Sequence, residues 1–117
     1  MKKVKIENYV QINMKIKDIN KYIFYELEMT QSHIIILYLI LNSVDQKLDL
    51  KGLCEETASA SSVITRQVKE LEQKGYVKKI RNEDNLRKVY VYMSNKQKED
   101  TLALMDLIEE YIKQYTL

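Results

Sequence analysis

The 117-residue sequence contains no proline, no tryptophan and only two glycines. Because proline and glycine are the strongest breakers of regular structure, their scarcity favours long helices and argues against a β fold with many turns. The apolar run over residues 34–41 is too short to span a bilayer, so we expect no transmembrane helix and no membrane partner. The first residues, MKKVKIENYV, contain no apolar signal core, so we expect a cytoplasmic protein.

Cysteine and histidine are equally scarce. The single cysteine, Cys54, excludes an internal disulfide and fits a reducing compartment. His33 is the only histidine, so it has no histidine partner with which to bind zinc, and we expect no metal site. The sequence also lacks a phosphate-binding loop and a nucleophile elbow. We therefore expect no catalytic residue, no cofactor and no enzyme activity.

The charged residues are unevenly distributed along the chain. Residues 62–98 include ten basic and four acidic side chains, a local charge of +6, although the whole chain carries only +2. A basic segment in an otherwise acidic chain is typical of nucleic-acid binding, although a solvated helix and hairpin surface would give the same pattern. Charge alone does not choose between these two interpretations.

Residues 61–93 contain a motif that favours nucleic-acid binding over a solvated surface. Ile64, Val68 and Leu71 recur at i, i+4 and i+7, which places them on one face of a helix, and Gly75 suits the end of that helix. Residues 76–80 and 89–92 favour β-strands, and the polar segment between them has the composition of a loop. A helix followed by a β-hairpin is the core of a winged helix-turn-helix, in which the helix enters a DNA major groove and the hairpin, or wing, reaches the neighbouring backbone.

This stretch resembles the recognition helix and wing of the MarR family of bacterial transcription regulators, and in particular its Sar-type (staphylococcal accessory regulator, SarA-like) branch. The matching residues are Ser62, Ile64, Thr65, Arg66, Val68, Leu71, Glu72, Gly75, Tyr76, Val77 and Arg87, followed by the strand over residues 89–93. The wing departs from the pattern, because the family's Asp falls on Asn85 while Asp84 lies one position earlier. The resemblance implies a mainly α fold with a small β-hairpin wing (α+β).

The two terminal segments are predicted to form long helices of a single domain spanning residues 1–117. Residues 5–28 carry an apolar stripe wider than one neighbour needs, and residues 95–115, which begin at a capping box of Ser94 and Gln97, carry two apolar rows. Core packing is the plain interpretation. We favour core packing plus a homodimer seam, since Sar-type regulators pair through their terminal helices and two-fold dimers are the commonest oligomers. The rows are Leu102, Met105, Ile108, Ile112 and Tyr115, and Leu104, Leu107 and Tyr111.

The middle of the chain completes the predicted fold. Thr30 is expected to cap a helix over residues 34–41 that is apolar on all sides and therefore central and buried; a buried β-strand is the competing interpretation. Residues 48–50 are expected to add a short strand to the wing sheet. The helix-turn-helix spans residues 50–74, with a helix over 50–57 and a tight turn at 58–60 in which Ser59 could cap the recognition helix, and the wing spans residues 76–93.

The winged-helix interpretation names the DNA-binding residues. They are Ser61, Ser62, Thr65, Arg66, Gln67 and Lys69 on the helix, and Lys78, Lys79, Arg81, Arg87 and Lys88 on the wing. Arg66 would either read a guanine or hold a phosphate without specifying sequence, and Gln67 is the other candidate reader. Arg87 is the predicted minor-groove contact, because a guanidinium suits the negative potential of a narrow A·T groove. A solvated role is the alternative for each basic residue.

Cys54 has two interpretations. MarR-type regulators sometimes sense oxidants through one cysteine, which makes Cys54 a possible redox site. Free cysteine is also among the most buried residue types, so we expect it to pack in the core. Nine tyrosines are present, but nothing in their spacing marks a pocket for a small-molecule effector.

Three functions fit these features. We predict a sequence-selective transcriptional regulator that binds A·T-rich double-stranded DNA as a homodimer, on half-sites about one helical turn apart. A DNA-organising or plasmid-partition protein would use the same fold to coat repeated sites, and cooperative spreading would distinguish it. A protein–protein adaptor that has lost DNA binding is the third, and the basic wing argues against it.

Overall fold

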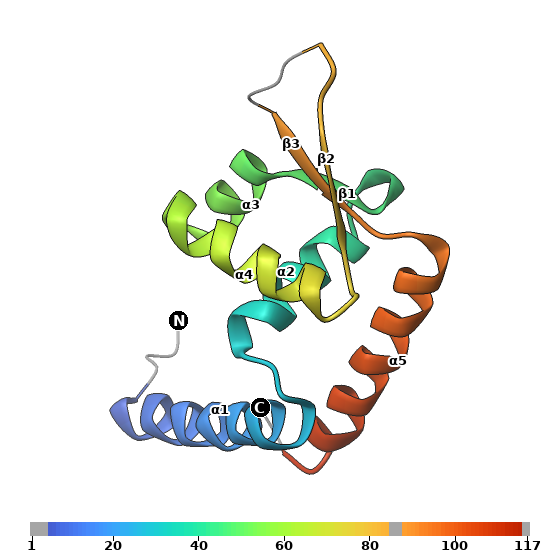
Figure 1. Cartoon of the computed structure of the whole chain (residues 1–117). Helices are drawn as coiled ribbons and strands as arrows, with labels where there is room; N and C mark the ends of the chain where they lie inside the picture. The colour runs from blue at the N-terminus through green and yellow to red at the C-terminus, as the bar shows by residue number, and fades with distance from the viewer. Residues whose placement is uncertain (1–4, 85–87, 116–117) are drawn as a thin grey trace.

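The structure, a computed structural model, describes residues 5–84 and 88–115. Its elements are α1 (Ile6–Leu27), α2 (Gln31–Leu41), a 3-10 turn η1 (Val44–Gln46), β1 (Lys47–Asp49), α3 (Leu50–Thr57), α4 (Ser61–Gln73), β2 (Lys78–Arg81), β3 (Val89–Tyr92) and α5 (Asn95–Ile112). Within this described part, the helices and the small antiparallel sheet confirm the predicted mainly α fold with a β-hairpin wing. The molecule is elongated, and Figure 1 shows the wing at one end, α1 at the other and α5 running between them.

The wing sheet has the strand order β1-β3-β2, and both pairs are antiparallel. Leu48 lies opposite Val91, which confirms the predicted short strand before α3. Arg81 lies opposite Val89 on the other edge of the sheet. Val91 in the central strand is buried, whereas every residue of β2 is exposed. The β2 strand therefore offers its side chains to solvent on both faces.

The α2 helix lies at the centre of the core. The Thr30 Oγ1 accepts a hydrogen bond from the His33 N–H at 3.3 Å, which confirms the predicted N-cap and the helical interpretation of this segment. However, Ile35 and Tyr38 are 43% and 57% exposed, so the prediction of a helix buried on all sides is wrong for one face. The elements packed against α2 leave that face uncovered. The buried apolar side chains of α2 are Ile36, Leu37 and Ile40.

The helix-turn-helix consists of α3 and α4. Asp49 caps α3 through Oδ1, which accepts the Gly52 N–H at 2.7 Å, and a Cβ at Gly52 would lie only 2.8 Å from the same oxygen. A glycine that helix propensity marks as a weak point thus leaves room for the cap. The prediction that Ser59 caps α4 is wrong. The N-cap is Ala60, which makes no side-chain cap bond, and the Ser59 hydroxyl donates to the Thr57 carbonyl at 3.2 Å.

The α4 helix ends at the predicted glycine. Gly75 has φ of +85°, in the left-handed region that glycine adopts without a steric penalty. The Tyr76 N–H donates to the Leu71 carbonyl at 3.0 Å, so the chain turns back over the end of the helix in the manner of a Schellman cap.

Replacing Gly75 by alanine is expected to lower the free energy of unfolding by about 1–2 kcal/mol, because an L side chain is strained at positive φ. Urea denaturation followed by circular dichroism measures this change. The matched control is Gln73→Ala, an exposed position in the same helix, for which we expect a change within about 0.5 kcal/mol. Equal losses in the two variants would contradict the explanation from backbone strain.

The α5 helix begins at the predicted capping box and ends at Ile112, three residues before the predicted end. Tyr115 N–H donates to the Ile112 carbonyl, an i to i−3 bond typical of a closing turn. The predicted apolar rows are also divided differently, since Leu102 of the first row is 45% exposed. The buried face follows the helical spacing i, i+4, i+7 and i+11 and consists of Gln97, Thr101, Leu104 and Ile108.

Two tyrosines lie where α5 meets its neighbours. The Tyr111 hydroxyl donates to Asp18 Oδ2 at 3.3 Å, and its ring stacks on Tyr22 with a centroid distance of 4.0 Å. Desolvation and the Asp18 carboxylate raise the pKa of Tyr111 above its ordinary value, so the phenol remains a donor at neutral pH. Burial, followed by the Asp100 carboxylate, likewise raises the pKa of Tyr76. The contacts of Tyr111 with Asp18 and Tyr22 join α1 to α5.

The N-terminal half of α1 extends beyond the rest of the chain (Figure 1). Only Ile19 and Ile23, in the C-terminal half of the helix, are buried. The exposed apolar residues of the N-terminal half are Ile6, Tyr9, Val10, Ile12 and Met14, each at least 41% exposed. We call these five residues the α1 stripe. It is a wide apolar surface that the described part of the same chain does not cover, as the sequence predicts.

Candidate nucleic-acid interface

The α4 helix turns a polar face to solvent because its apolar residues are held in the core. Ile64, Val68 and Leu71 are buried, which confirms the predicted inward face. The remaining surface of the helix exposes Ser61, Ser62, Thr65, Arg66 and Lys69. Five of the six predicted DNA-binding residues of this helix are therefore accessible, and the sixth, Gln67, is half-buried.

Gln67 and Thr65 lie on different flanks of α4. Gln67 lines a hollow of about 270 Å³ together with Ser32 of α2 and Thr57 of α3. Thr65 lines a separate groove next to the wing. The structure thus places Gln67 apart from Thr65, although both were predicted to contact DNA.

The groove next to Thr65 lies between α4 and the wing and has a volume of about 240 Å³. Lys79 and Arg81 of β2 line it. Because successive side chains of a strand point to opposite faces, these two alternate with Lys78 and Ile80, which lie on the other face of β2. The groove brings a hydroxyl of α4 close to two wing cations that lie at least fourteen positions away in the sequence.

Two contacts of basic residues in the wing sheet were not predicted. Lys79 Nζ lies 3.4 Å from Glu72 Oε1, an ion pair that links the wing to α4. Lys47 Nζ lies 4.5 Å from the centroid of the Tyr90 ring, at the other edge of the sheet. Both pairs depend on how the wing folds back on the helix and on the strand register, so sequence spacing gives no signal for them. A phosphate bound at Lys79 would compete with the Glu72 carboxylate.

The start of the wing loop is shaped by an asparagine. Asn82 Oδ1 accepts the Asp84 N–H at 2.8 Å, which forms an Asx turn, and the Asn82 N–H donates to the Lys88 carbonyl at 2.9 Å. Lys88 is exposed next to this turn, and Lys78 is exposed at the other end of β2, opposite Tyr92. Arg87 and Asn85 lie outside the described residues. The predicted minor-groove contact and the departure from the family's wing pattern therefore stay sequence predictions.

The remaining candidate sites lie in or near the core. Cys54 is partly buried and packs against the core cluster, as expected for a packing residue, and oxidant sensing stays a prediction. His33 is buried in the first turn of α2. Within residues 5–84 and 88–115, no three histidine, cysteine, aspartate or glutamate side chains are grouped so that they could hold a metal ion. None of the described helices combines the length and apolar character needed to cross a membrane.

Comparisons with known proteins agree with this geometry. Residues 18–104 match the sequence model of the SarA/Rot transcriptional regulators. The fold is similar to AbsC, a MarR family transcriptional regulator from Streptomyces coelicolor, with TM-score 0.78, 12% identity and coverage of 97% of this chain and 81% of that chain. It is similar to the MarR family regulator Sco3205 from the same organism in complex with DNA, with TM-score 0.74, 13% identity and coverage of 97% and 76%. It is also similar to reduced AbfR bound to DNA, with TM-score 0.73, 17% identity and coverage of 87% and 72%.

These matches differ in what they establish. At such low identities the solved structures establish the fold alone, a winged helix of the MarR type, because one fold serves many functions. The family match is more specific, since it extends from the second half of α1 through α4 and the wing into α5. It identifies a family of regulators and not of enzymes, as the sequence predicts. The chain belongs to the SarA/Rot family of transcriptional regulators.

Proposed function

We propose that the chain regulates transcription by binding double-stranded DNA as a homodimer, with α4 in the major groove and the wing at the adjacent minor groove. The groove between α4 and the wing carries this proposal, because Thr65, Lys79 and Arg81 line it and the next residue of α4, Arg66, is exposed. Two similar structures, those of Sco3205 and AbfR, are described as DNA complexes. The blocking of a promoter in the cytoplasm is the simplest mode of action.

Some of these residues would position the protein on the DNA backbone, and others would read the base sequence. The hydroxyls of Ser61 and Ser62, in the first turn of α4, suit phosphate oxygens, which also favour the N-terminal end of a helix. Arg66 is the proposed base reader, since a bidentate contact to guanine is worth about 1–3 kcal/mol of discrimination. Gln67 is proposed as a secondary reader because it is half-buried. The proposed phosphate contacts are Lys69, Lys78, Lys79, Arg81 and Lys88.

A second copy of the chain would cover the α1 stripe. Val10 and Met14 are 50% and 61% exposed, and a continuous apolar surface of this kind marks an interaction site more often than a solvated face. The α1 helix lies at the opposite end of the molecule from the wing (Figure 1), so pairing there leaves α4 free for DNA. The homodimer would thus present two recognition helices to two half-sites.

Fluorescence anisotropy on a short A·T-rich duplex, titrated with salt, tests the DNA-binding part of this proposal. We expect tight, salt-sensitive binding by the wild type. Arg87→Ala is expected to weaken binding and, if Arg87 holds one phosphate, to flatten log K against log salt by about 0.9. The matched control is Lys113→Ala, which removes the same charge at the end of α5 and is expected to leave the slope unchanged.

The absence of wild-type binding at low salt would refute the proposal and favour a protein–protein adaptor. DNase I footprinting then separates the two DNA-binding functions. A single discrete footprint is expected of a regulator, whereas protection that spreads along the DNA would favour a DNA-organising protein.

A further inference from the structure

Two residues that cap helices also contact the recognition helix. His33 and Gln97 each occupy the third helical position of a capping box, His33 in α2 and Gln97 in α5, and both are buried. Each uses one side-chain atom to accept the N–H of its N-cap residue. The Nε2 atom of His33 reaches Glu70, in the C-terminal part of α4. The Nε2 atom of Gln97 reaches Gly75, the residue that follows the C-cap of α4.

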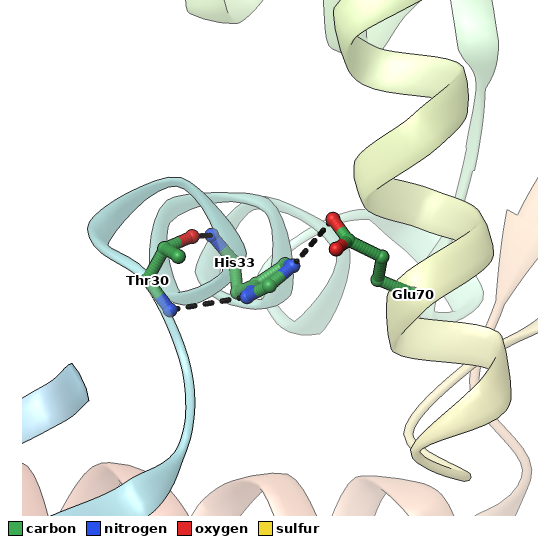
Figure 2. A network of polar contacts seen from close by, with 3 residues as sticks. All are labelled: Thr30, His33 and Glu70. Carbon is green, nitrogen blue, oxygen red and sulfur yellow. Dashed lines mark hydrogen bonds and ion pairs between the residues drawn. The ribbon is translucent and has the colours of Figure 1, made fainter. Parts of the chain in front are cut away.

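Figure 2 shows the His33 contact, with the imidazole between Thr30 and Glu70. The Thr30 N–H donates to His33 Nδ1 at 3.1 Å, and His33 Nε2 lies 3.3 Å from Glu70 Oε1. Because Nδ1 accepts a hydrogen bond, the neutral ring carries its proton on Nε2 and donates it to Glu70. The cap of α2 therefore fixes the orientation of a donor to α4.

Gln97 repeats this arrangement from α5. Its Oε1 accepts the Ser94 N–H at 2.9 Å, and its Nε2 donates to the Gly75 carbonyl at 3.1 Å. Gly75 directly follows Lys74, the C-cap of α4. The C-terminal end of the recognition helix is thus bonded to the first turns of both α2 and α5.

If α4 is held at its C-terminal end, any change in its angle moves the N-terminal end the most. The thirteen residues of α4 span about 20 Å, so a tilt of roughly 10° about that end would move the DNA-facing first turn by about 3 Å. This displacement is close to the rise of one base pair, about 3.4 Å. The packing of Ile64, Val68 and Leu71 in the core sets the angle of α4, and the two hydrogen bonds restrict this tilt further, because each needs defined donor and acceptor positions.

We propose that His33 and Gln97 are positioning residues that hold α4 at a defined angle to α1 and α5 and thereby set the half-site spacing that the dimer accepts. The chain passes from α1 into α2 through only three residues, so the first turn of α2 transmits the position of α1. The effect on spacing rests on the proposed homodimeric function, whereas the effect on the helix angle does not.

The comparison of Glu70→Ala with Glu70→Gln separates the hydrogen bond from the charge. Both variants remove the same negative charge, but glutamine keeps an acceptor for His33 Nε2. Thr30→Ala is a further control, because it removes the side-chain cap of α2 and leaves the contact between His33 and Glu70. Gln97→Glu keeps the acceptor for Ser94 and loses the donor to Gly75.

Electron–electron double resonance reads the helix angle without DNA. Spin labels are placed at Lys21→Cys in α1 and Ser61→Cys in α4 on a Cys54→Ser background, and labelled chains are diluted with unlabelled chains so that intrachain distances dominate. We expect Glu70→Ala and Gln97→Glu to shift or broaden the distance distribution by about 3 Å, the displacement of a 10° tilt. Glu70→Gln and Thr30→Ala are expected to keep the wild-type distribution, the latter with a lower Tm. Equal distributions for Glu70→Ala and Glu70→Gln would overturn the proposal.

Duplexes whose half-site spacing differs by one base pair then test the consequence for DNA. We expect the preference for one spacing to be lost in Glu70→Ala and retained in Glu70→Gln, and an unchanged preference in both would overturn the role in spacing. If the wild-type protein binds no duplex, the proposed function is refuted instead. The spin-label distances, which need no DNA, would then be the test of whether His33 and Gln97 hold the angle of α4.

Discussion

Replacing Arg66 by alanine is expected to weaken specific DNA binding roughly 10- to 100-fold, in line with the ~1–3 kcal/mol assigned to a bidentate guanine contact. Arg66 is exposed on α4, on the side away from the buried Ile64 and Val68, so the substitution should leave the fold intact. Anisotropy titrations with a specific and an unrelated duplex measure the effect. A base reader loses affinity only for the specific duplex, whereas a phosphate contact loses affinity for both.

Lys74→Ala is the matched control for Arg66→Ala. Lys74 is an exposed cation at the opposite end of α4, in a hollow shared with Tyr76 and Asp100, and it is not among the predicted DNA contacts. We expect its removal to change affinity several-fold less than the removal of Arg66. Similar losses for the two variants would show that general positive charge, and not the position of Arg66, determines binding.

Val10→Asp is expected to convert the homodimer to monomers and to reduce DNA affinity by about 100-fold or more, since avidity from two linked half-sites contributes factors of 10²–10⁴. Val10 is 50% exposed within one chain, so the substitution should change the stability of the single chain by no more than about 0.5 kcal/mol. In a dimer seam the same carboxylate would be buried without a partner, which is strongly unfavourable. Sedimentation equilibrium measures the oligomeric state.

Gln11→Asp is the control for this experiment, because it places the same charge at the next position, an exposed residue outside the α1 stripe. It is expected to remain dimeric and to bind DNA with nearly wild-type affinity. A Val10→Asp variant that also remained dimeric would place the seam elsewhere on the molecule.

Local sequence signals identified most of the elements and their ends. The spacing of Ile64, Val68 and Leu71 predicted the buried face of α4, and Gly75 predicted its end. Thr30 and Ser94 predicted the starts of α2 and α5. These signals succeed because a cap or a helical face depends on residues within a few positions of one another, which the sequence displays directly.

The same local reasoning failed where the packing of neighbouring elements determines the start of a helix or the exposure of a side chain. Ser59 has the side chain of a cap but lies one position before the N-cap Ala60, because the turn after α3 sets where α4 begins. Tyr38 continues an apolar run and is nevertheless exposed, because the elements packed against α2 leave that face open. Leu102 fits an apolar row of α5, but the helix is rotated so that Thr101 and Leu104 face the core.

Short-range patterns were thus enough to predict the class of fold, the helix α4 and the wing, since each depends on residues that lie close together along the chain. Which distant side chains meet became visible only in three dimensions: Lys79 with Glu72, His33 with Glu70, and Gln97 with the Gly75 carbonyl. Such pairs depend on the angle at which whole helices and strands cross. That angle results from the packing of the entire core, and no spacing within one segment encodes it.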